Sequence, residues 1–216
     1  MKQLILYGFN SLTREIVKFC EKEKEYHVSY ICVDKAYLND SDYKGLPIIA
    51  FEDLNQLDMS HYEVLITFGY SNMNEIKRQK YNICKEKHYT MANFISENAM
   101  VYTDDIGDSN IIMPNVVISN GVSIGNCNTF YPSVVVGHDC NIGSFNFIAS
   151  CADILGMVNI GDQCFIGGNS TIIDGKSLAS CSLIGAGAVV SINTEKDQVI
   201  VPNRSILLEK KSQDFY

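Results

Sequence analysis

The 216-residue sequence predicts a parallel β-solenoid built from hexapeptides, preceded by a smaller α/β domain. Three observations carry this prediction. A bulky apolar residue recurs at every sixth position fifteen times without a break, and the pair Ile-Gly opens four successive blocks of eighteen residues. Before residue 91 the pattern differs, because short apolar runs alternate with segments of helical periodicity. Neither an α-helix nor a plain strand repeats every six residues, so this period indicates a solenoid.

The repeat residues define the coils of the solenoid. They are Ile106, Ile112, Ile118, Ile124, Phe130, Val136, Ile142, Ile148, Ile154, Ile160, Ile166, Ile172, Leu178, Ile184 and Val190. Three hexapeptides make one triangular coil, so each repeat residue should point into a prism and stack on its counterpart one coil away, roughly 4.8 Å along the axis. A β-sandwich is the alternative, but it predicts alternation by two and irregular spacing. We expect the solenoid over residues 106–193, between a linker at 91–105 and a C-terminal tail at 194–216.

Residues 1–90 predict a Rossmann-like domain. We expect strands at 3–7, 26–33 and 62–68, helices at 11–24 and 72–87, and a further short strand at 90–95. Ser11 is the candidate N-cap of the first helix. Strands that alternate with helices imply a parallel sheet, whose ligands bind beyond the carboxyl ends of the strands.

The loops at that edge supply candidate substrate-binding residues. These are Gly8, Asn10, Ser11, Asp34, Lys35, Gly69 and Tyr70. A helix N-terminus after Gly8 could hold a phosphate. The alternative is also open, because a single glycine in GFNSLTRE is no dinucleotide fingerprint and an Asp after a strand is as often a turn residue.

Composition excludes several classes of function. The formal net charge is −8 and no basic tract is present, so we expect no nucleic-acid partner. No apolar run approaches the length that spans a bilayer and the first residues lack a signal-peptide layout, so we expect a soluble, cytoplasmic protein with no membrane partner. The eight cysteines form no C-x-x-C pair, and we expect most of them to be small buried hydrophobic residues.

His138 is the one histidine of the predicted solenoid. It follows the repeat residue Val136 by two positions, at an outward corner, and Asp139 comes next. An imidazole beside a carboxylate can accept a proton near neutral pH. Gly156 lies eighteen residues later, where it leaves room beside the imidazole and could offer its N–H to an oxyanion. A solvated corner histidine beside a turn glycine is the alternative, and one histidine is too few for a three-histidine zinc site, so we expect no metal.

Four segments resemble one family of enzymes. They are GLPIIAFEDL (45–54), ITFGYSN (66–72), VVVGHDCNIGSF (134–145) and LIGAGAVV (183–190). With them the chain resembles, nearly end to end, the hexapeptide-repeat acyltransferases of the sialic acid O-acetyltransferase and bacillosamine-type amino-sugar N-acetyltransferase family. The resemblance implies a left-handed parallel β-helix, acetyl-CoA as co-substrate, and a homotrimer with its active sites between subunits.

The resemblance also assigns roles. It makes His138 the general base, with Asp139 and Gly156 as its catalytic neighbours, and places a nucleotide-linked sugar in the N-terminal domain. The residues expected toward coenzyme A are Gly156, Gly168, Asp174, Ala186 and Arg204, with Lys210 and Lys211 as further candidates for its phosphates. A solvated charged tail is the alternative for the last three.

Three residues depart from the family. Leu12 and Phe147 stand where the family has histidines, and Tyr131, which we expect near the sugar, stands where it often has an asparagine. We expect N-acetylation of the amino group of a UDP- or dTDP-linked amino-deoxysugar for surface-glycan synthesis, because an amine demands less of the base than a hydroxyl. Sugar O-acetylation and a non-catalytic scaffold are the alternatives. We also expect the outward Tyr131, Phe145 and Phe147 to be covered by a second copy.

Overall fold

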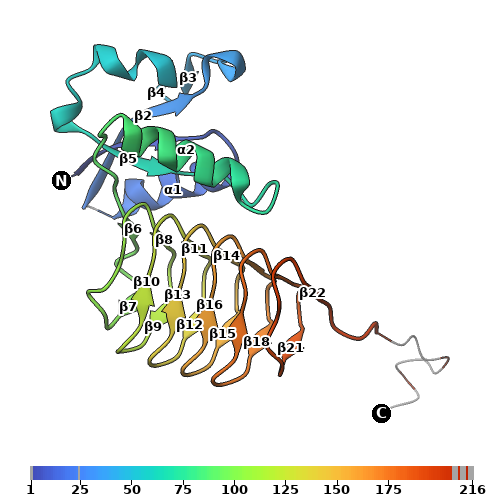
Figure 1. The fold of residues 1–216 in the computed structure, drawn as a ribbon. Coiled ribbons are helices and arrows are strands. Elements are labelled where there is room, and N and C mark those ends of the chain that lie inside the picture. Colours follow the sequence, from blue (N-terminus) through green and yellow to red (C-terminus); the bar gives the residue numbers. More distant parts are fainter. Residues whose placement is uncertain (1, 24, 206–208, 210–212, 214–216) are drawn as a thin grey trace.

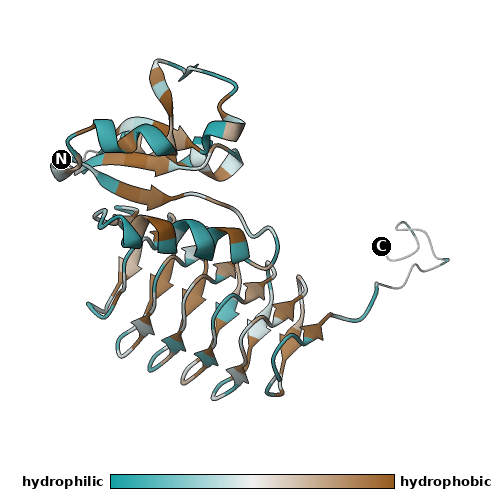
Figure 2. Cartoon of the chain, turned by 45° about the horizontal axis from the view of Figure 1, so that its top comes forward, coloured by the Kyte–Doolittle hydropathy of each residue, from teal (hydrophilic) through white to brown (hydrophobic). Residues whose placement is uncertain are grey.

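The computed structural model describes residues 2–23, 25–205, 209 and 213. An α/β domain lies along one side of a triangular prism of stacked coils, and the chain leaves the prism at the far end (Figure 1). The apolar strands of the prism and of the N-terminal sheet stand out from the polar turns in Figure 2. The predicted order of the two parts is confirmed.

The N-terminal sheet has five strands in the order β3-β4-β2-β1-β5. Its parallel strands are β1 (Lys2–Tyr7), β2 (Tyr26–Val33), β4 (Leu46–Ala50) and β5 (Glu63–Ile66), and β3 (Asp42–Tyr43) is antiparallel at the edge. The helices are α1 (Ser11–Lys22) and α2 (Glu75–Glu86), with the short 3₁₀ turns η1 (Lys35–Tyr37), η2 (Phe51–Gln56) and η3 (Met59–His61). The prediction missed β3 and β4, because 3₁₀ turns and a hairpin replace the helix expected between parallel strands.

Two helix starts differ from the sequence prediction. Asn10, and not Ser11, is the N-cap of α1: its Oδ1 accepts the Thr13 N–H at 3.3 Å, and Thr13 Oγ1 accepts the Asn10 N–H at 3.1 Å. This reciprocal pair satisfies two N–H groups at the helix start. Helix α2 begins three residues later than predicted, since residues 72–74 all have positive φ and cannot form its first turn.

The prism has three faces of short parallel strands. The first face contains β6 (Phe94–Ile95), β8 (Ile111–Ile112), β11 (Thr129–Phe130), β14 (Phe147–Ile148), β17 (Phe165–Ile166), β20 (Leu183–Ile184) and β22 (Val199–Ile200). The second contains β7 (Met100–Val101), β9 (Val117–Ile118), β12 (Val135–Val136), β15 (Asp153–Ile154), β18 (Thr171–Ile172) and β21 (Val189–Val190). The third contains β10 (Ser123–Ile124), β13 (Asn141–Ile142), β16 (Asn159–Ile160) and β19 (Ser177–Leu178).

Stacking follows the predicted spacing. Val136 pairs with Ile154, eighteen residues later, and Ile154 pairs with Ile172. All repeat residues from Ile112 to Val190 are buried, and Ile106 is partly buried. The corners turn through a residue of positive φ at every sixth position from Ser109 to Gly187. Most of these are neither Gly nor Asn, so the regular strand pairing holds them in a conformation that a free residue would avoid.

The solenoid is longer than predicted at both ends. Phe94 pairs with Ile111 and Leu183 pairs with Val199, so coils run from residue 94 to residue 200. The predicted linker at 91–105 therefore belongs largely to the first coil, and the predicted tail begins inside the last one. Those pairs are seventeen and sixteen residues apart instead of eighteen, so a count by six loses the register at each end.

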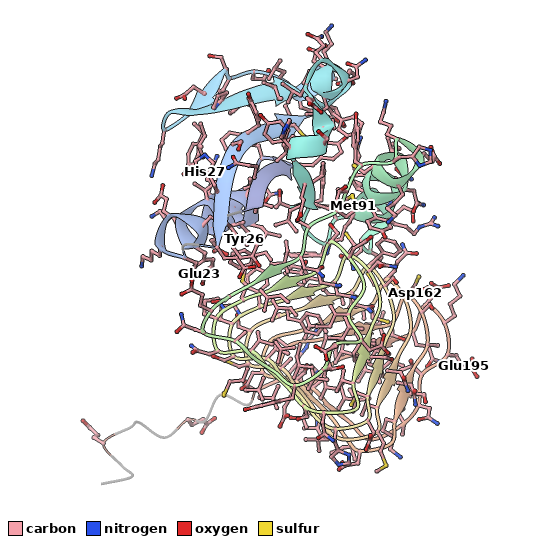
Figure 3. The ribbon with its side chains drawn as sticks, turned by 90° about the vertical axis from the view of Figure 1, so that its left-hand side faces the viewer. Glu23, Tyr26, His27, Met91, Asp162 and Glu195 are labelled. Atoms are coloured by element: carbon pink, nitrogen blue, oxygen red, sulfur yellow. The ribbon has the colours of Figure 1, made fainter. Side chains whose placement is uncertain are left out.

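Helix α2 fastens the α/β domain to the first face. Lys77 Nζ donates to Thr129 Oγ1 at 3.0 Å, Asn74 Nδ2 donates to the Cys164 carbonyl at 3.3 Å, and Gln163 Nε2 donates to Glu75 at 3.0 Å. A second contact between the two parts involves Glu23, which Figure 3 labels beside the first coil. The Ser96 hydroxyl donates to the buried Glu23 carboxylate at 2.6 Å. These contacts hold the two parts together as one packed body.

Candidate active site

His138 lies on the edge of the prism between the second and third faces. Its Nδ1 is 2.9 Å from Asp139 Oδ2, and both side chains are more than half exposed. Asp139 is one of the corner residues with positive φ (55°), which turns its carboxylate back toward the preceding ring. With Nδ1 committed to the carboxylate, Nε2 is the ring nitrogen left to exchange a proton. The structure thus shows a direct contact between the two side chains, which their adjacency in the sequence leaves open.

Gly156 lies against the imidazole one coil further. A Cβ on Gly156 would stand 2.6 Å from His138 Nε2 and 2.9 Å from Cε1, so the ring position requires a glycine here. The Gly156 N–H, which we expected to be free for an oxyanion, instead donates to Asp174 Oδ1 at 3.0 Å. The oxyanion role therefore stays a prediction, and it requires the Gly156 N–H to exchange the Asp174 carboxylate for the thioester oxygen.

A cavity of about 560 Å³ opens at the carboxyl ends of β1, β2 and β5. Four of the expected substrate-binding residues line it: Gly8, Asn10, Asp34 and Gly69. Ser11, Lys35, Tyr70 and Tyr131 do not line this cavity. Sequence reasoning missed Tyr37, Asn39, Asp40, Ser71 and Lys80, which do, since no motif marks them.

The Asp34 carboxylate is bound by two other side chains in this cavity. One carboxylate oxygen accepts the Tyr7 hydroxyl, and the other lies 2.6 Å from Lys80 Nζ. Burial, together with the neighbouring Asp34 carboxylate, raises the pKa of the Tyr7 hydroxyl far above its usual range. Tyr7 therefore stays a donor, and Asp34 is a positioned carboxylate and more than a turn residue. Lys80 comes from α2, so its role depends on how that helix packs.

Asn10 has a structural task beside the cavity. Besides capping α1, it donates from Nδ2 to the Thr67 carbonyl at 2.8 Å. Gly8 has φ +124° and a Cβ there would meet Thr67 at 3.1 Å, so the turn after β1 requires glycine.

An aromatic cluster lies between the Gly69–Ser71 loop and the first face of the prism. The Tyr70 ring is 4.8 Å from Phe147 and 4.9 Å from Phe165, and Tyr131 is 5.0 Å from Phe147. Phe145 packs on Tyr81 of α2 at 5.4 Å. The expectation that a second copy covers Tyr131, Phe145 and Phe147 is wrong, because the chain's own α/β domain contacts them.

The amino group of Lys77 lies buried under this cluster. Lys77 is 1% exposed, and burial lowers its pKa to about 8. Its Nζ is 5.8 Å from the centre of the Phe147 ring. No carboxylate of the described residues pairs with Lys77, so Thr129 and the ring face supply its polar environment.

The His138 edge and the cavity lie apart within one chain. The α/β domain covers the first face (Figure 1), whereas His138 follows β12 and precedes β13 and so lies on the edge between the other two faces. The residues expected to bind coenzyme A are divided as well. Gly156 and Asp174 lie on the His138 edge, whereas Gly168 and Ala186 follow strands of the first face and lie on a different edge. Arg204 is exposed beyond β22, and Lys210 and Lys211 fall outside the described residues.

The cysteines are mostly buried, as predicted. Six of the eight are buried and none is paired. Burial raises the pKa of the Cys127 and Cys164 thiols to about 12, so neither is a thiolate near neutral pH. Within residues 2–23, 25–205, 209 and 213, no three His, Cys, Asp or Glu side chains gather in a way that could hold a metal ion. The same residues include no helix with the length and apolarity to cross a bilayer.

Solved structures share this architecture. A variant of perosamine N-acetyltransferase from Caulobacter crescentus, in complex with CoA and GDP-perosamine, superposes with a TM-score of 0.82 at 18% identity, covering 94% of each chain. The acetyltransferase domain of PglB from Neisseria gonorrhoeae gives 0.82 at 20% identity, covering 96% of this chain and all of that one. WeeI from Acinetobacter baumannii gives 0.70 at 17% identity, over 96% of this chain and all of that one.

Neither a protein-family model nor a curated protein matches the sequence. At these identities the structural likeness establishes the fold: an α/β domain followed by a left-handed parallel β-helix.

Proposed function

We propose that this protein transfers the acetyl group of acetyl-CoA to the amino group of a nucleotide-linked amino-deoxysugar. The observation that carries the proposal is the His138 edge, where a carboxylate holds Nδ1 and a glycine leaves Nε2 open. The shared fold supports it, since perosamine N-acetyltransferase, which has this fold, forms a complex with CoA and GDP-perosamine. The cavity at the carboxyl ends of the strands is the usual place for a nucleotide in such a sheet.

The chemistry requires one base and one acyl donor. The lone pair of the sugar amine attacks the thioester carbonyl carbon, so a C–N bond forms and the C–S bond then breaks. His138 Nε2 takes the proton that the amine loses, and the coenzyme leaves as a thiol after protonation. Asp139 holds the ring and stabilises the imidazolium that forms. No metal takes part in this scheme.

Gly156 and Asp174 supply the remaining step of the proposal. When the thioester binds, its carbonyl oxygen takes the Gly156 N–H from the Asp174 carboxylate. The N–H then stabilises the negative charge that develops on that oxygen. An exposed carboxylate is displaced at modest cost, because water satisfies it when it leaves. We assign Gly168, Ala186 and Arg204 to the coenzyme on a neighbouring edge, as the resemblance implies.

The complete site needs a second copy of the chain, and we propose a homotrimer. One chain has its cavity in the domain that packs on the first face and its His138 on the edge between the other two faces, so we infer that the His138 that serves a cavity comes from a neighbour. Exposed apolar side chains on the second face support such contact, including Met100 at 51% and Val189 at 66% exposure. Closed symmetric assemblies bring different patches of identical chains together in this way. The proposal includes a cytoplasmic location, which the unpaired cysteines favour.

Mixed assemblies test the shared site. The variant His138→Asn retains a cavity, and Asp34→Leu retains His138, so neither homotrimer should be active. Co-expression of the two should restore activity at about one site in four, because each site then draws its two halves at random. Activity no higher than that of the separate variants would refute a site shared between copies.

Release of coenzyme A thiol from acetyl-CoA tests the reaction. Nucleotide-linked 3- and 4-amino sugars are the acceptors, with hydroxyl-only sugars as controls. We expect turnover with an amino sugar, and a fall in kcat of about 10²-fold or more in His138→Ala. Near-normal turnover in that variant would refute the assigned base, and turnover with hydroxyl acceptors alone would make the protein an O-acetyltransferase. Failure to bind coenzyme A would indicate a scaffold.

A further inference from the structure

The cavity at the sheet edge adjoins the start of helix α1. Gly8 and Asn10 bring the chain from β1 into α1, so the first N–H groups of this twelve-residue helix adjoin the cavity. A helix start after the first strand is where α/β sheets bind a diphosphate. Asp34 follows β2, the position from which a carboxylate bonds a ribose hydroxyl. The order of phosphate, then ribose, sets where the base must lie.

The segment that follows Asp34 in the chain also lines the cavity, at Tyr37, Asn39 and Asp40, and Ile48 adds an apolar side chain to the lining. The Asp34 carboxylate is already bound by Tyr7 and Lys80. In contrast, the side chains of Asn39 and Asp40 make no hydrogen bond or ion pair with any other described residue. Both side chains are exposed, so one carboxylate and one amide of the cavity lining are free of polar contacts within the described part of the protein.

We infer that this end of the cavity selects guanine, so that the acceptor is a guanosine diphosphate sugar and not the UDP- or dTDP-linked sugar expected from the sequence. The inference rests on the proposed function, in which a nucleotide carries the sugar. A carboxylate accepts two hydrogen bonds side by side and donates none. Guanine offers two adjacent donors, N1–H and the N2 amino group, to Asp40, and its O6 accepts from the Asn39 amide.

The other bases fit this pair poorly. Uracil and thymine present one N–H between two carbonyl oxygens, which the Asp40 carboxylate would repel. Adenine presents one amino group beside a ring nitrogen that is itself an acceptor. Adenine has the same stacking area as guanine, so a comparison of the two isolates the polar edge from the size of the base.

Calorimetric titration of the full chain with GDP, ADP, UDP and dTDP tests the inference without any transfer reaction. We expect a Kd for GDP that is about tenfold to a hundredfold below that of the other three, as for a well-placed bidentate contact to a base. Asp40→Asn should remove most of this preference, because it weakens the contact to guanine and relieves the repulsion of the uracil carbonyl oxygens. Asp42→Asn, which makes the same charge change two residues away and outside the cavity, should keep the preference.

The outcomes separate the two proposals. Tighter binding of UDP or dTDP than of GDP, or an unchanged preference in Asp40→Asn, refutes guanine selection and leaves the nucleotide-linked acceptor in place. Equal binding of GDP and ADP refutes the polar contact and points to stacking alone. Failure of all four nucleotides to bind refutes both the guanine inference and the proposed acceptor.

Discussion

The substitution Gly156→Ala tests the catalytic edge most directly. It adds a single methyl group where a Cβ would lie 2.6 Å from His138 Nε2, whereas ordinary contact begins at 3.4 Å. The imidazole must therefore retreat by about 0.8 Å, away from the Asp139 geometry that now holds it. Gly156 does not have a left-handed backbone, so alanine fits the main chain and keeps the N–H that Asp174 accepts.

The loss of rate caused by a shift of this size in a catalytic group can be estimated. A misplacement of about 1 Å can cost on the order of 10²-fold in rate, so we expect kcat to fall by about 30- to 100-fold in Gly156→Ala. The KM for acetyl-CoA should change by less than about threefold, since the backbone donor remains. The assay is thiol release from acetyl-CoA with the acceptor that supports the fastest turnover of the unmodified protein.

A double-mutant cycle identifies the cause. If the methyl group acts by displacing His138, Gly156→Ala should have little further effect in a His138→Asn background, because the displaced group is already gone. A kcat within twofold of normal in Gly156→Ala would refute the reasoning. So would an undiminished loss in the double variant, which would mean that Gly156 acts independently of the histidine.

Three further predictions concern stability and the donor at Gly156. In Lys77→Met, the free energy of unfolding measured in urea should exceed that of the unmodified protein at pH 7. This difference should shrink by about 3 kcal/mol between pH 8 and 10.5, because over that range the unfolded chain still binds the proton that folded Lys77 has lost. A difference that does not change with pH would contradict the lowered pKa of Lys77. Asp174→Ala should raise kcat/KM for acetyl-CoA about fivefold, since no carboxylate then competes for the Gly156 N–H, and a loss of kcat/KM would show that Asp174 helps the reaction. Ile154→Ala, at a fully buried position, should lower the free energy of unfolding by about 2–5 kcal/mol; a loss below about 1 kcal/mol, measured by urea unfolding, would contradict tight stacking.

Much of the prism could be predicted from local order in the sequence. Each face of the prism uses six residues, so every sixth residue has the same position and points inward. Val136, Ile154 and Ile172, each eighteen residues apart, therefore stack on one another. The same count places Gly156 beside His138, one coil away. Where the coil length changes, at residues 94 and 199, the count fails and so did the predicted boundaries.

The α/β domain was less predictable because its features depend on contacts between distant segments. Strand β4 was missed since no helix precedes it, and Lys80 was missed since a lysine on a helix has no local sign of a carboxylate partner. Asp174 likewise has nothing near it in sequence that marks it as the acceptor of the Gly156 N–H. Each contact joins residues that only packing brings together.

The sequence by itself determined the coil, its repeat and the column of residues on the His138 edge, because a solenoid repeats one local geometry and equal spacing then means equal position. The tertiary structure alone decided which face the α/β domain covers (Figure 1), and hence that this domain, with its cavity, lies on a face that does not border His138. The docking of α2 depends on the fit of Asn74 and Lys77 to the first face, a fit between surfaces far apart in the chain. The residues that make this fit follow no repeating pattern, so the sequence alone does not reveal it.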